Sequence, residues 1–144
     1  MTKTKVLFLC TGNSCRSQMA EGWLRELAGN EFEVFSAGVN PVGLNPLAVA
    51  VMREVGIDMS HHRSKHADDF LGQNFSYVIT VCDSAREHCP IFPGAHKKLH
   101  WSFEDPGAVQ GSEAERLEVF RRVRDEIGDR VRELLRTAAR TMNA

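Results

Sequence analysis

The sequence predicts an α/β protein, a single domain in which a four-stranded parallel sheet is flanked by helices. Four short apolar or alternating runs have the length of β-strands, segments with helical spacing lie between them, and the two types alternate along the chain. The length of 144 residues is that of one ordinary domain. We expect this domain to span residues 1–140, with a short C-terminal tail at 141–144.

The four predicted strands are short. The first, Lys5–Leu9 (KVLFL), is a nearly continuous apolar run, which is typical of a parallel strand covered on both faces. The second, Phe32–Gly38, alternates between apolar and polar residues. Two further runs, Tyr77–Val81 and Lys97–Trp101, complete the predicted sheet.

Three segments have the pattern of helices. In the first, Ser17 is the predicted N-cap and Gly29 ends the helix. In the second, Asn45 is the predicted cap, a proline follows at the first helical position, and Gly56 is the stop. The third runs from Ser112 to about residue 140 and carries arginines and carboxylates on its outer face. The predicted buried face of the first helix consists of Met19, Ala20, Trp23, Leu24 and Leu27.

Composition and charge exclude several classes of protein. The formal net charge of −1 leaves no basic surface of the kind that binds nucleic acid. No apolar run approaches the roughly 20 residues that span a bilayer, and the N-terminal run has no signal-peptide cleavage site. We therefore expect a cytoplasmic protein without membrane or nucleic-acid partners, for which a monomer suffices. Its four cysteines are then reduced thiols, available for catalysis, metal binding or packing.

Three reactive side chains follow predicted strands. Cys10, Cys82 and Asp105 each lie just after a strand, and ligands of open α/β sheets bind beyond the carboxyl ends of strands. The ordinary interpretation of any single free cysteine is burial, because cysteine packs like a small hydrophobe. Two thiols and a carboxylate at one edge of a sheet indicate a catalytic site instead.

The loop CTGNSCR, between the first strand and the first helix, has the composition of an anion-binding cradle. Gly12 allows a backbone turn that other residues resist, and Asn13 tolerates left-handed geometry. Successive backbone N–H groups can then point inward, beside the positive end of the helix dipole. Arg16 can make bidentate hydrogen bonds to a tetrahedral oxyanion. The predicted oxyanion-binding residues are Thr11, Gly12, Asn13, Ser14, Cys15 and Arg16.

Cys10 is expected at the floor of this cradle. Positively polarised surroundings favour the thiolate, which is the nucleophilic form of cysteine, and the hydroxyl of Ser17 can hydrogen-bond to that sulfur. Two other interpretations of the loop are a tight strand–helix turn around a buried thiol and a zinc site that uses Cys10 and Cys15. The arginine beside such a metal disfavours the zinc site. Cys15 itself is more typical of a packed structural thiol than of a second nucleophile.

Three stretches resemble the low-molecular-weight tyrosine phosphatase superfamily, and within it the thioredoxin-coupled arsenate reductases. They are CTGNSCRSQMAEG (10–22), VCDSAREHCPIFPG (81–94) and HWSFEDP (100–106). The resemblance implies a low-molecular-weight phosphatase-like fold, arsenate as the substrate with phosphate and sulfate as mimics, and thioredoxin as the reductant. No cofactor is expected, and glutaredoxin or another low-molecular-weight thiol is an alternative electron donor.

The resemblance implies a relay of three cysteines. Cys10 attacks arsenic, and Asp105 protonates the departing oxygen as general acid. Cys82 then attacks the Cys10 sulfur and arsenite leaves, after which Cys89 attacks Cys82 and leaves a Cys82–Cys89 disulfide for the reductant. The predicted catalytic residues are Cys10, Cys82, Cys89, Arg16, Asp105 and Ser17.

The spacing of the last two cysteines predicts a rearrangement. A helical turn that carried Cys82 and Cys89 would hold them about 10 Å apart along its axis. A disulfide needs Cα atoms within roughly 4.4–6.8 Å of each other. We therefore expect this segment to refold or loop out during each cycle.

The chain departs from the phosphatase branch at three places. Gln18 stands where phosphatases commonly have proline, and Gly107 stands where they commonly have tyrosine. Tyr77 is the only tyrosine of the chain, so the tyrosines that line the mouth for an aryl phosphate are missing. These departures favour the reductase, although the cradle, the thiolate and the acid leave weak hydrolysis of small phosphate esters as a side activity.

Two other functions compete with the reductase. The first is a low-molecular-weight protein tyrosine or small-ester phosphatase in which Cys82 and Cys89 merely guard Cys10 against oxidation. The second is a non-catalytic oxyanion or metal sensor that uses its cysteines as ligands. A sensor has no need of an acid such as Asp105 beside the cradle, which disfavours it.

A cation site is considered and disfavoured. Asn13, Glu21 and Ser36 resemble part of a potassium site found in some reductases of this branch, whose remaining carboxylate ligand would fall near Lys65. A lysine there disfavours a bound cation and can replace its charge, so no required metal is predicted. The six histidines have no ligand-like spacing and are expected at the surface or behind the site.

Overall fold

The computed structural model describes residues 3–83, 92 and 97–142. Four strands, β1 (Thr4–Cys10), β2 (Phe32–Gly38), β3 (Tyr77–Thr80) and β4 (Lys97–His100), form one sheet in the order β2-β1-β3-β4. Every neighbouring pair in the sheet is parallel. The predicted four-stranded parallel sheet is thus confirmed, with each strand boundary within one residue of the prediction.

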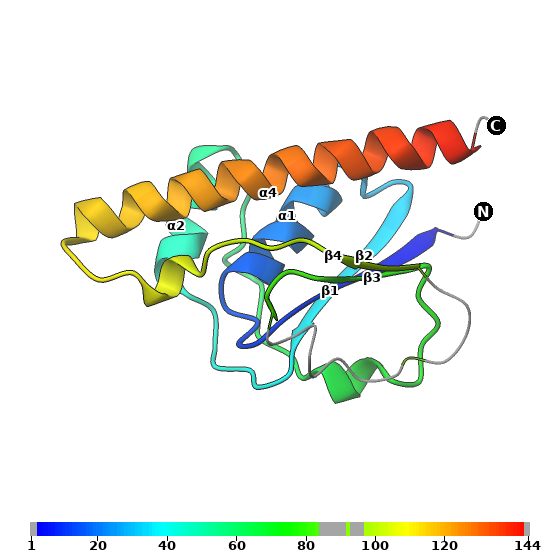
Figure 1. Cartoon of the computed structure of the whole chain (residues 1–144), viewed down its shortest axis with the longest axis horizontal. Coiled ribbons are helices and arrows are strands. Elements are labelled where there is room, and N and C mark those ends of the chain that lie inside the picture. Colours follow the sequence, from blue (N-terminus) through cyan, green and yellow to red (C-terminus); the bar gives the residue numbers. More distant parts are fainter. Residues whose placement is uncertain (1–2, 84–91, 93–96, 143–144) are drawn as a thin grey trace.

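The helices are α1 (Arg16–Ala28), α2 (Pro46–Glu54) and α4 (Glu113–Met142), with two short 3₁₀ helices, η1 (Ala67–Phe70) and η2 (Pro106–Ala108). Helices α1 and α4 lie together on one side of the sheet, and α4 runs the length of the molecule (Figure 1). Helix α4 continues through Met142, beyond the predicted end of the domain at residue 140.

The predicted helix signals hold at α2 and fail in part at α1. The Asn45 side chain accepts a hydrogen bond from the backbone N–H of Leu47 at 2.8 Å, and Gly56 follows the helix with φ of 83°. The prediction that Ser17 caps α1 is wrong. Cys15 occupies the cap position without a side-chain cap bond, and Ser17 lies inside the first turn, where its hydroxyl contacts Cys10 instead.

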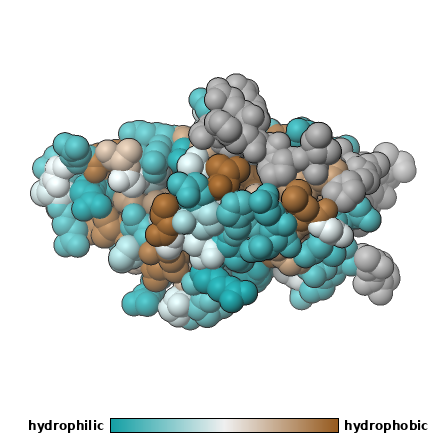
Figure 2. Space-filling view, turned by 90° about the horizontal axis from the view of Figure 1, so that it is seen from below, coloured by the Kyte–Doolittle hydropathy of each residue, from teal (hydrophilic) through white to brown (hydrophobic). Residues whose placement is uncertain are grey.

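The core covers both faces of the sheet, with helices α1 and α4 on one of them. The central strand β1 is buried on both faces, as its apolar run predicts, with Val6 to Leu9 fully inaccessible. Leu27, predicted on the buried face of α1, is 41% exposed, so that prediction is wrong. On the face seen in Figure 2, apolar side chains form small, separate patches among polar ones. No helix among the described residues is both long and apolar enough to span a membrane.

Candidate active site

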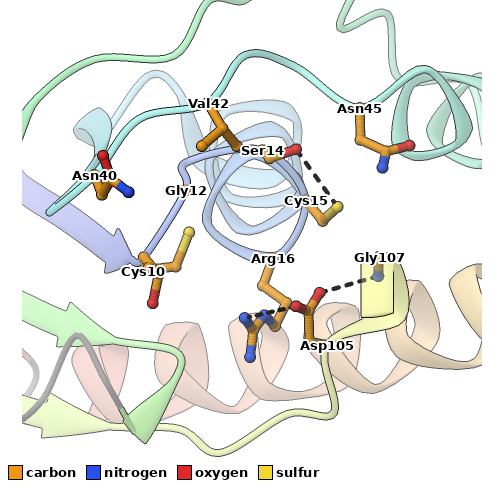
Figure 3. Close-up of a pocket in the computed structure, with 11 residues that line it drawn as sticks. Cys10, Gly12, Ser14, Cys15, Arg16, Asn40, Val42, Asn45, Asp105 and Gly107 are labelled. Carbon is orange, nitrogen blue, oxygen red and sulfur yellow. Dashed lines mark hydrogen bonds and ion pairs between the residues drawn. The ribbon is translucent and has the colours of Figure 1, made fainter. Parts of the chain in front are cut away.

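A cavity of about 450 Å³ opens at the carboxyl end of β1. Figure 3 shows Cys10 at one end of it, Asn45 and Gly107 at the other, and Arg16 with Asp105 between them. The predicted topology is therefore correct in bringing the first thiol and the carboxylate to one edge of the sheet. The cavity is lined by Cys10, Thr11, Gly12, Ser14, Cys15, Arg16, Asn40, Val42, Asn45, Asp105 and Gly107.

The loop at residues 10–16 is held in place by a second loop at residues 39–45, whose role the sequence pattern did not indicate. Backbone N–H groups of the second loop donate, at 2.8–3.2 Å, to four carbonyl groups of the first. This pairing turns those carbonyl oxygens away from the cavity, where they would repel an anion. The four bonds are Val39 to Cys10, Asn40 to Thr11, Val42 to Gly12 and Asn45 to Ser14.

Asn13 is the brace of the loop. It is the one described non-glycine residue with positive φ, 47°, and it is fully buried behind the loop rather than in the cavity lining. Its Oδ1 accepts from the backbone N–H of Lys65 at 2.9 Å and from Gln18 Nε2 at 3.0 Å. Its Nδ2 donates to the hydroxyls of Ser17 at 2.8 Å and Ser36 at 3.0 Å. The left-handed conformation predicted for Asn13 is confirmed.

The brace also meets the Cys10 sulfur. Ser17 Oγ accepts from Asn13 Nδ2 and lies 2.8 Å from Cys10 Sγ, to which its hydroxyl can donate. The backbone N–H of Asn13 donates to the same sulfur at 3.1 Å. Two groups that can donate a hydrogen bond therefore converge on one buried sulfur.

Glycine is needed in the loop for space rather than for left-handed geometry. Gly12 has no positive φ, so the predicted reason for that glycine is wrong; a Cβ there would lie 2.8 Å from a methyl group of Val42. Gly38, at the end of β2, is packed more tightly against the loop than Gly12 is. The sequence pattern did not indicate this contact. A Cβ on Gly38 would lie 2.5 Å from the carbonyl oxygen of Thr11 and 2.8 Å from the nitrogen of Asn13.

Arg16 and Asp105 lie side by side in the lining of the cavity. The Arg16 guanidinium donates to the backbone oxygen of Phe103 at 3.1 Å and lies 3.7 Å from Asp105 Oδ2. Asp105 is half-exposed, and its other oxygen accepts from the N–H of Gly107 at 2.9 Å. Arg16 thus lies between the thiol end of the cavity and the carboxylate, with its fork of donors lining the space (Figure 3).

The other cysteines have distinct environments. Burial raises the pKa of the Cys15 thiol to about 12, so Cys15 is protonated at neutral pH, as expected of a packed thiol. Cys82 is 5% exposed, and its sulfur lies 3.3 Å from the hydroxyl of Thr11. Cys89 lies outside the described residues.

The register of the sheet explains the contact between Thr11 and Cys82. Leu9 of β1 pairs with Thr80 of β3, and the strands run in parallel. Two residues further along each strand, the chain reaches Thr11 and Cys82 side by side. The second thiol therefore lies next to the loop that carries the first.

The ammonium of Lys65 lies among the residues that resemble part of a potassium site. Its ammonium lies 3.3 Å from Glu21 Oε1 and 3.4 Å from Ser36 Oγ, and Ser36 donates to Glu21 at 2.6 Å. Burial alone would raise the pKa of Glu21, but Lys65, Ser36 and Arg25 outweigh burial and lower it. Among residues 3–83, 92 and 97–142, no cluster of His, Cys, Asp or Glu is arranged to hold a metal ion.

His62 lies behind the site, one of the two places expected for the histidines. Its Nδ1 donates to Gln18 Oε1 at 2.9 Å, which orients the Gln18 amide that donates to Asn13. Burial lowers the pKa of His62, so its ring is neutral at physiological pH. Gln18 is thus part of the brace, which gives a physical reason for a residue noted only as a departure from phosphatases.

The chain is similar to known proteins in sequence and in fold. An arsenate reductase of Bacillus subtilis (strain 168) is 50% identical over 132 residues, covering 92% of this chain and 95% of that protein. Two solved structures superpose along nearly the whole chain. One is an arsenate reductase in the phosphate binding state, with TM-score 0.76 and 34% identity over 93% of this chain and 98% of its own.

The second solved structure is a thioredoxin-dependent arsenate reductase of Corynebacterium glutamicum, with TM-score 0.75 and 31% identity. The match covers 96% of this chain and 63% of that one. Residues 5–144 match the low molecular weight phosphotyrosine protein phosphatase family. On the length of that match, and on the identity to the relatives, this chain is a member of the low molecular weight phosphotyrosine protein phosphatase family.

Proposed function

We propose that this protein reduces arsenate to arsenite through a relay of Cys10, Cys82 and Cys89, and that thioredoxin regenerates it. The observation that carries the proposal is the second thiol beside the cradle. Cys82 contacts Thr11, the residue after Cys10, at 3.3 Å. A phosphatase needs only Cys10, Arg16 and an acid, whereas a reductase needs a second sulfur within reach of the first. The names of the similar proteins agree with this choice.

In the first step, arsenate binds between the loop and Arg16, and the Cys10 thiolate attacks arsenic. A sulfur–arsenic bond forms while an arsenic–oxygen bond breaks, and Asp105 gives its proton to the departing oxygen, which leaves as water or hydroxide. The half-exposed carboxyl of Asp105 lines the same cavity as Cys10, where it can protonate an oxygen that leaves arsenic.

In the second step, Cys82 attacks the Cys10 sulfur and loses its own proton. The sulfur–arsenic bond breaks, and its electron pair stays on arsenic, which is thereby reduced from As(V) to As(III) and leaves as arsenite. A Cys10–Cys82 disulfide remains. Cys89 then displaces Cys10 from Cys82, and the dithiol of thioredoxin reduces the resulting Cys82–Cys89 disulfide. Two thiols are oxidised for each arsenate reduced.

The test is the disulfide formed after one equivalent of arsenate. Peptide mass spectrometry of the unaltered protein should find a Cys82–Cys89 bond, and the Cys89→Ser variant should stop at a Cys10–Cys82 bond. Cys15→Ala is the matched control, because its thiol is packed and protonated, and it should give the same Cys82–Cys89 bond. The proposal would be overturned if the unaltered protein formed no disulfide on addition of arsenate.

A small-ester phosphatase is the second candidate, since the cavity alone contains a thiol, a guanidinium and a carboxylate. Its family is named for that activity. The phosphatase would be the primary function if three results were obtained with p-nitrophenyl phosphate. Its hydrolysis would have to depend on Cys10, persist in the Cys82→Ser variant and be faster than arsenate turnover. Hydrolysis far slower than arsenate turnover would make it a side activity of the same cradle.

A further inference from the structure

A short chain of hydrogen bonds joins the end of the sheet to the residue after Cys82. His100, the last residue of β4, lies directly opposite Thr80, the last residue of β3. The His100 Nδ1 is 2.7 Å from Thr80 Oγ1, and its Nε2 is 2.9 Å from Asp83 Oδ1. We call the side chains of Thr80, His100 and Asp83 the strap. None of them lines the cavity.

The chemistry of the carboxylate fixes the direction of the outer bond. The Asp83 carboxylate can only accept, so His100 Nε2 carries a proton and donates it to Asp83. A neutral imidazole accepts the Thr80 hydroxyl proton at Nδ1; a protonated one donates to Thr80 Oγ1, whose own proton then points to the Leu99 carbonyl at 3.4 Å. In both forms the imidazole links a hydroxyl on the sheet to a carboxylate beyond it.

The strap acts where the sheet ends and the Cys82 segment begins. Thr80 and His100 belong to paired strands, and the backbone N–H of Trp101 donates to the Thr80 carbonyl at 2.8 Å. Asp83 is bonded directly to Cys82 in the chain, and its side chain is 68% exposed. Cys82, in contrast, is buried against Thr11. Holding Asp83 to the sheet therefore limits how far the Cys82 backbone can move from the cradle.

We propose that His100 is a positioning residue for Cys82: by holding Asp83 to Thr80, it keeps the Cys82 thiol buried beside Thr11, within reach of Cys10. The role of His100 in the attack of Cys82 on Cys10 rests on the proposed function. Its role in keeping the Cys82 thiol buried beside Thr11 does not. The strap is partly exposed, and exposed charged pairs contribute up to about 1 kcal/mol, so the expected effects are up to about fivefold.

The first experiment measures how fast iodoacetamide modifies each cysteine of the reduced protein, by peptide mass spectrometry. His100→Phe should raise the Cys82 rate by about three- to fivefold and leave the Cys10 rate unchanged. His100→Gln should restore the slow rate, because a Gln amide can donate to Asp83 and accept from Thr80. His66→Gln is the matched control, since His66 also faces a carboxylate, Asp68, but far along the chain from Cys82.

A second variant guards against a folding defect in His100→Phe. Thr80→Val keeps the branched shape and replaces the hydroxyl by a methyl group, so it should also raise the Cys82 rate without lowering the thermal unfolding midpoint. Equal Cys82 rates in all variants, or equal rises at Cys10 and Cys82, would overturn the proposal. This readout needs no arsenate and stands even if the proposed function fails.

The second experiment measures the chemical step, in a Cys89→Ser background with one equivalent of arsenate. His100→Phe should slow formation of the Cys10–Cys82 disulfide by about three- to fivefold and leave hydrolysis of p-nitrophenyl phosphate unchanged. If the parent protein forms no disulfide, it is the proposed function that fails. If the parent forms it and the His100→Phe variant forms it as fast, it is the positioning role that fails.

Discussion

Cys10 and Cys82, the two thiols that the proposed relay joins first, are held in opposite ways. Cys10 is surrounded by buried bonds: its loop is paired to residues 39–45, and Asn13 ties the loop to α1 and β2. Cys82 is held by a contact with Thr11 and, through Asp83, by a partly exposed bond to His100. An oxyanion cradle must keep its shape through the reaction, whereas in the proposed relay the second sulfur leaves its place to reach a third. Changes in the first region should therefore impair every activity, and changes in the second only the relay.

The largest effect should come from the brace. Asn13→Ala removes four side-chain bonds and the residue type that tolerates φ of 47°. With about 1 kcal/mol or more for each buried bond, kcat/KM should fall by about 10³-fold. Arsenate reduction and p-nitrophenyl phosphate hydrolysis should fall together. Asn74→Ala, at an exposed position, is the control. A variant that lost only arsenate reduction would contradict the division between the two regions.

Packing beneath the loop should be the next largest effect. In Gly38→Ala the new methyl meets backbone atoms of Thr11 and Asn13, which cannot turn aside as a side chain would. A displacement of the loop by about 1 Å costs on the order of 10²-fold in rate. Steady-state assays of both activities should show this loss, with Gly72→Ala, which meets nothing within 4 Å, retaining full activity. Unchanged rates in Gly38→Ala would mean that the loop tolerates displacement.

These two positions also mark how far the sequence could predict the site. The loop at residues 10–16 was predictable because its nucleophile, arginine and turn residues are contiguous, and Asn13 was the residue assigned the left-handed turn. Gly38 and the bonds from residues 39–45 depend on segments far from the loop in the chain that meet it only after folding. The sequence of a strand that ends in glycine does not indicate which segment of backbone will pack against that glycine.

The fold was more predictable than the side-chain directions. Continuous apolar burial identified β1, and Asn45, Pro46 and Gly56 delimited α2 because capping is a local property. Ser17 was misassigned as a cap because a hydroxyl at a helix start has two possible partners, and here the Cys10 sulfur is the one that it contacts. Leu27, in the last turn of α1, is exposed, because periodicity alone does not show where along a helix the buried face ends.

A smaller effect, on stability, is expected from the charge behind the cradle. Lys65→Met leaves the buried Glu21 carboxylate without its ammonium partner, although Arg25 still binds it at 2.7 Å. The free energy of unfolding at pH 7 should fall by about 2 kcal/mol. Lys98→Met, at an exposed position, should change it little. Urea titrations of the three proteins measure the difference.

The pH dependence of that loss has a definite sign. The folded protein holds the pKa of Glu21 below its ordinary value of 4.5, so the stabilisation is complete above that value and is lost as the pH falls through the lowered pKa. The difference between the parent and Lys65→Met should therefore be constant from pH 6 to 8 and shrink below about pH 4.5. A difference that grew in acid would mean that Lys65 stabilises the fold through contacts other than its pairing with Glu21.

The smallest effect should come from the contact between the two regions. Thr11→Val keeps the branched shape and removes the hydroxyl that lies 3.3 Å from the Cys82 sulfur. Loss of one such bond slows a step by about fivefold. Only formation of the Cys10–Cys82 disulfide should slow, in a single-turnover assay, while ester hydrolysis keeps its rate. Thr11→Ser should restore the step because the hydroxyl returns. If Thr11→Val instead slowed both activities alike, the hydroxyl would act on the oxyanion rather than on the second thiol. Thr11 would then belong functionally to the cradle and not to the segment that holds Cys82.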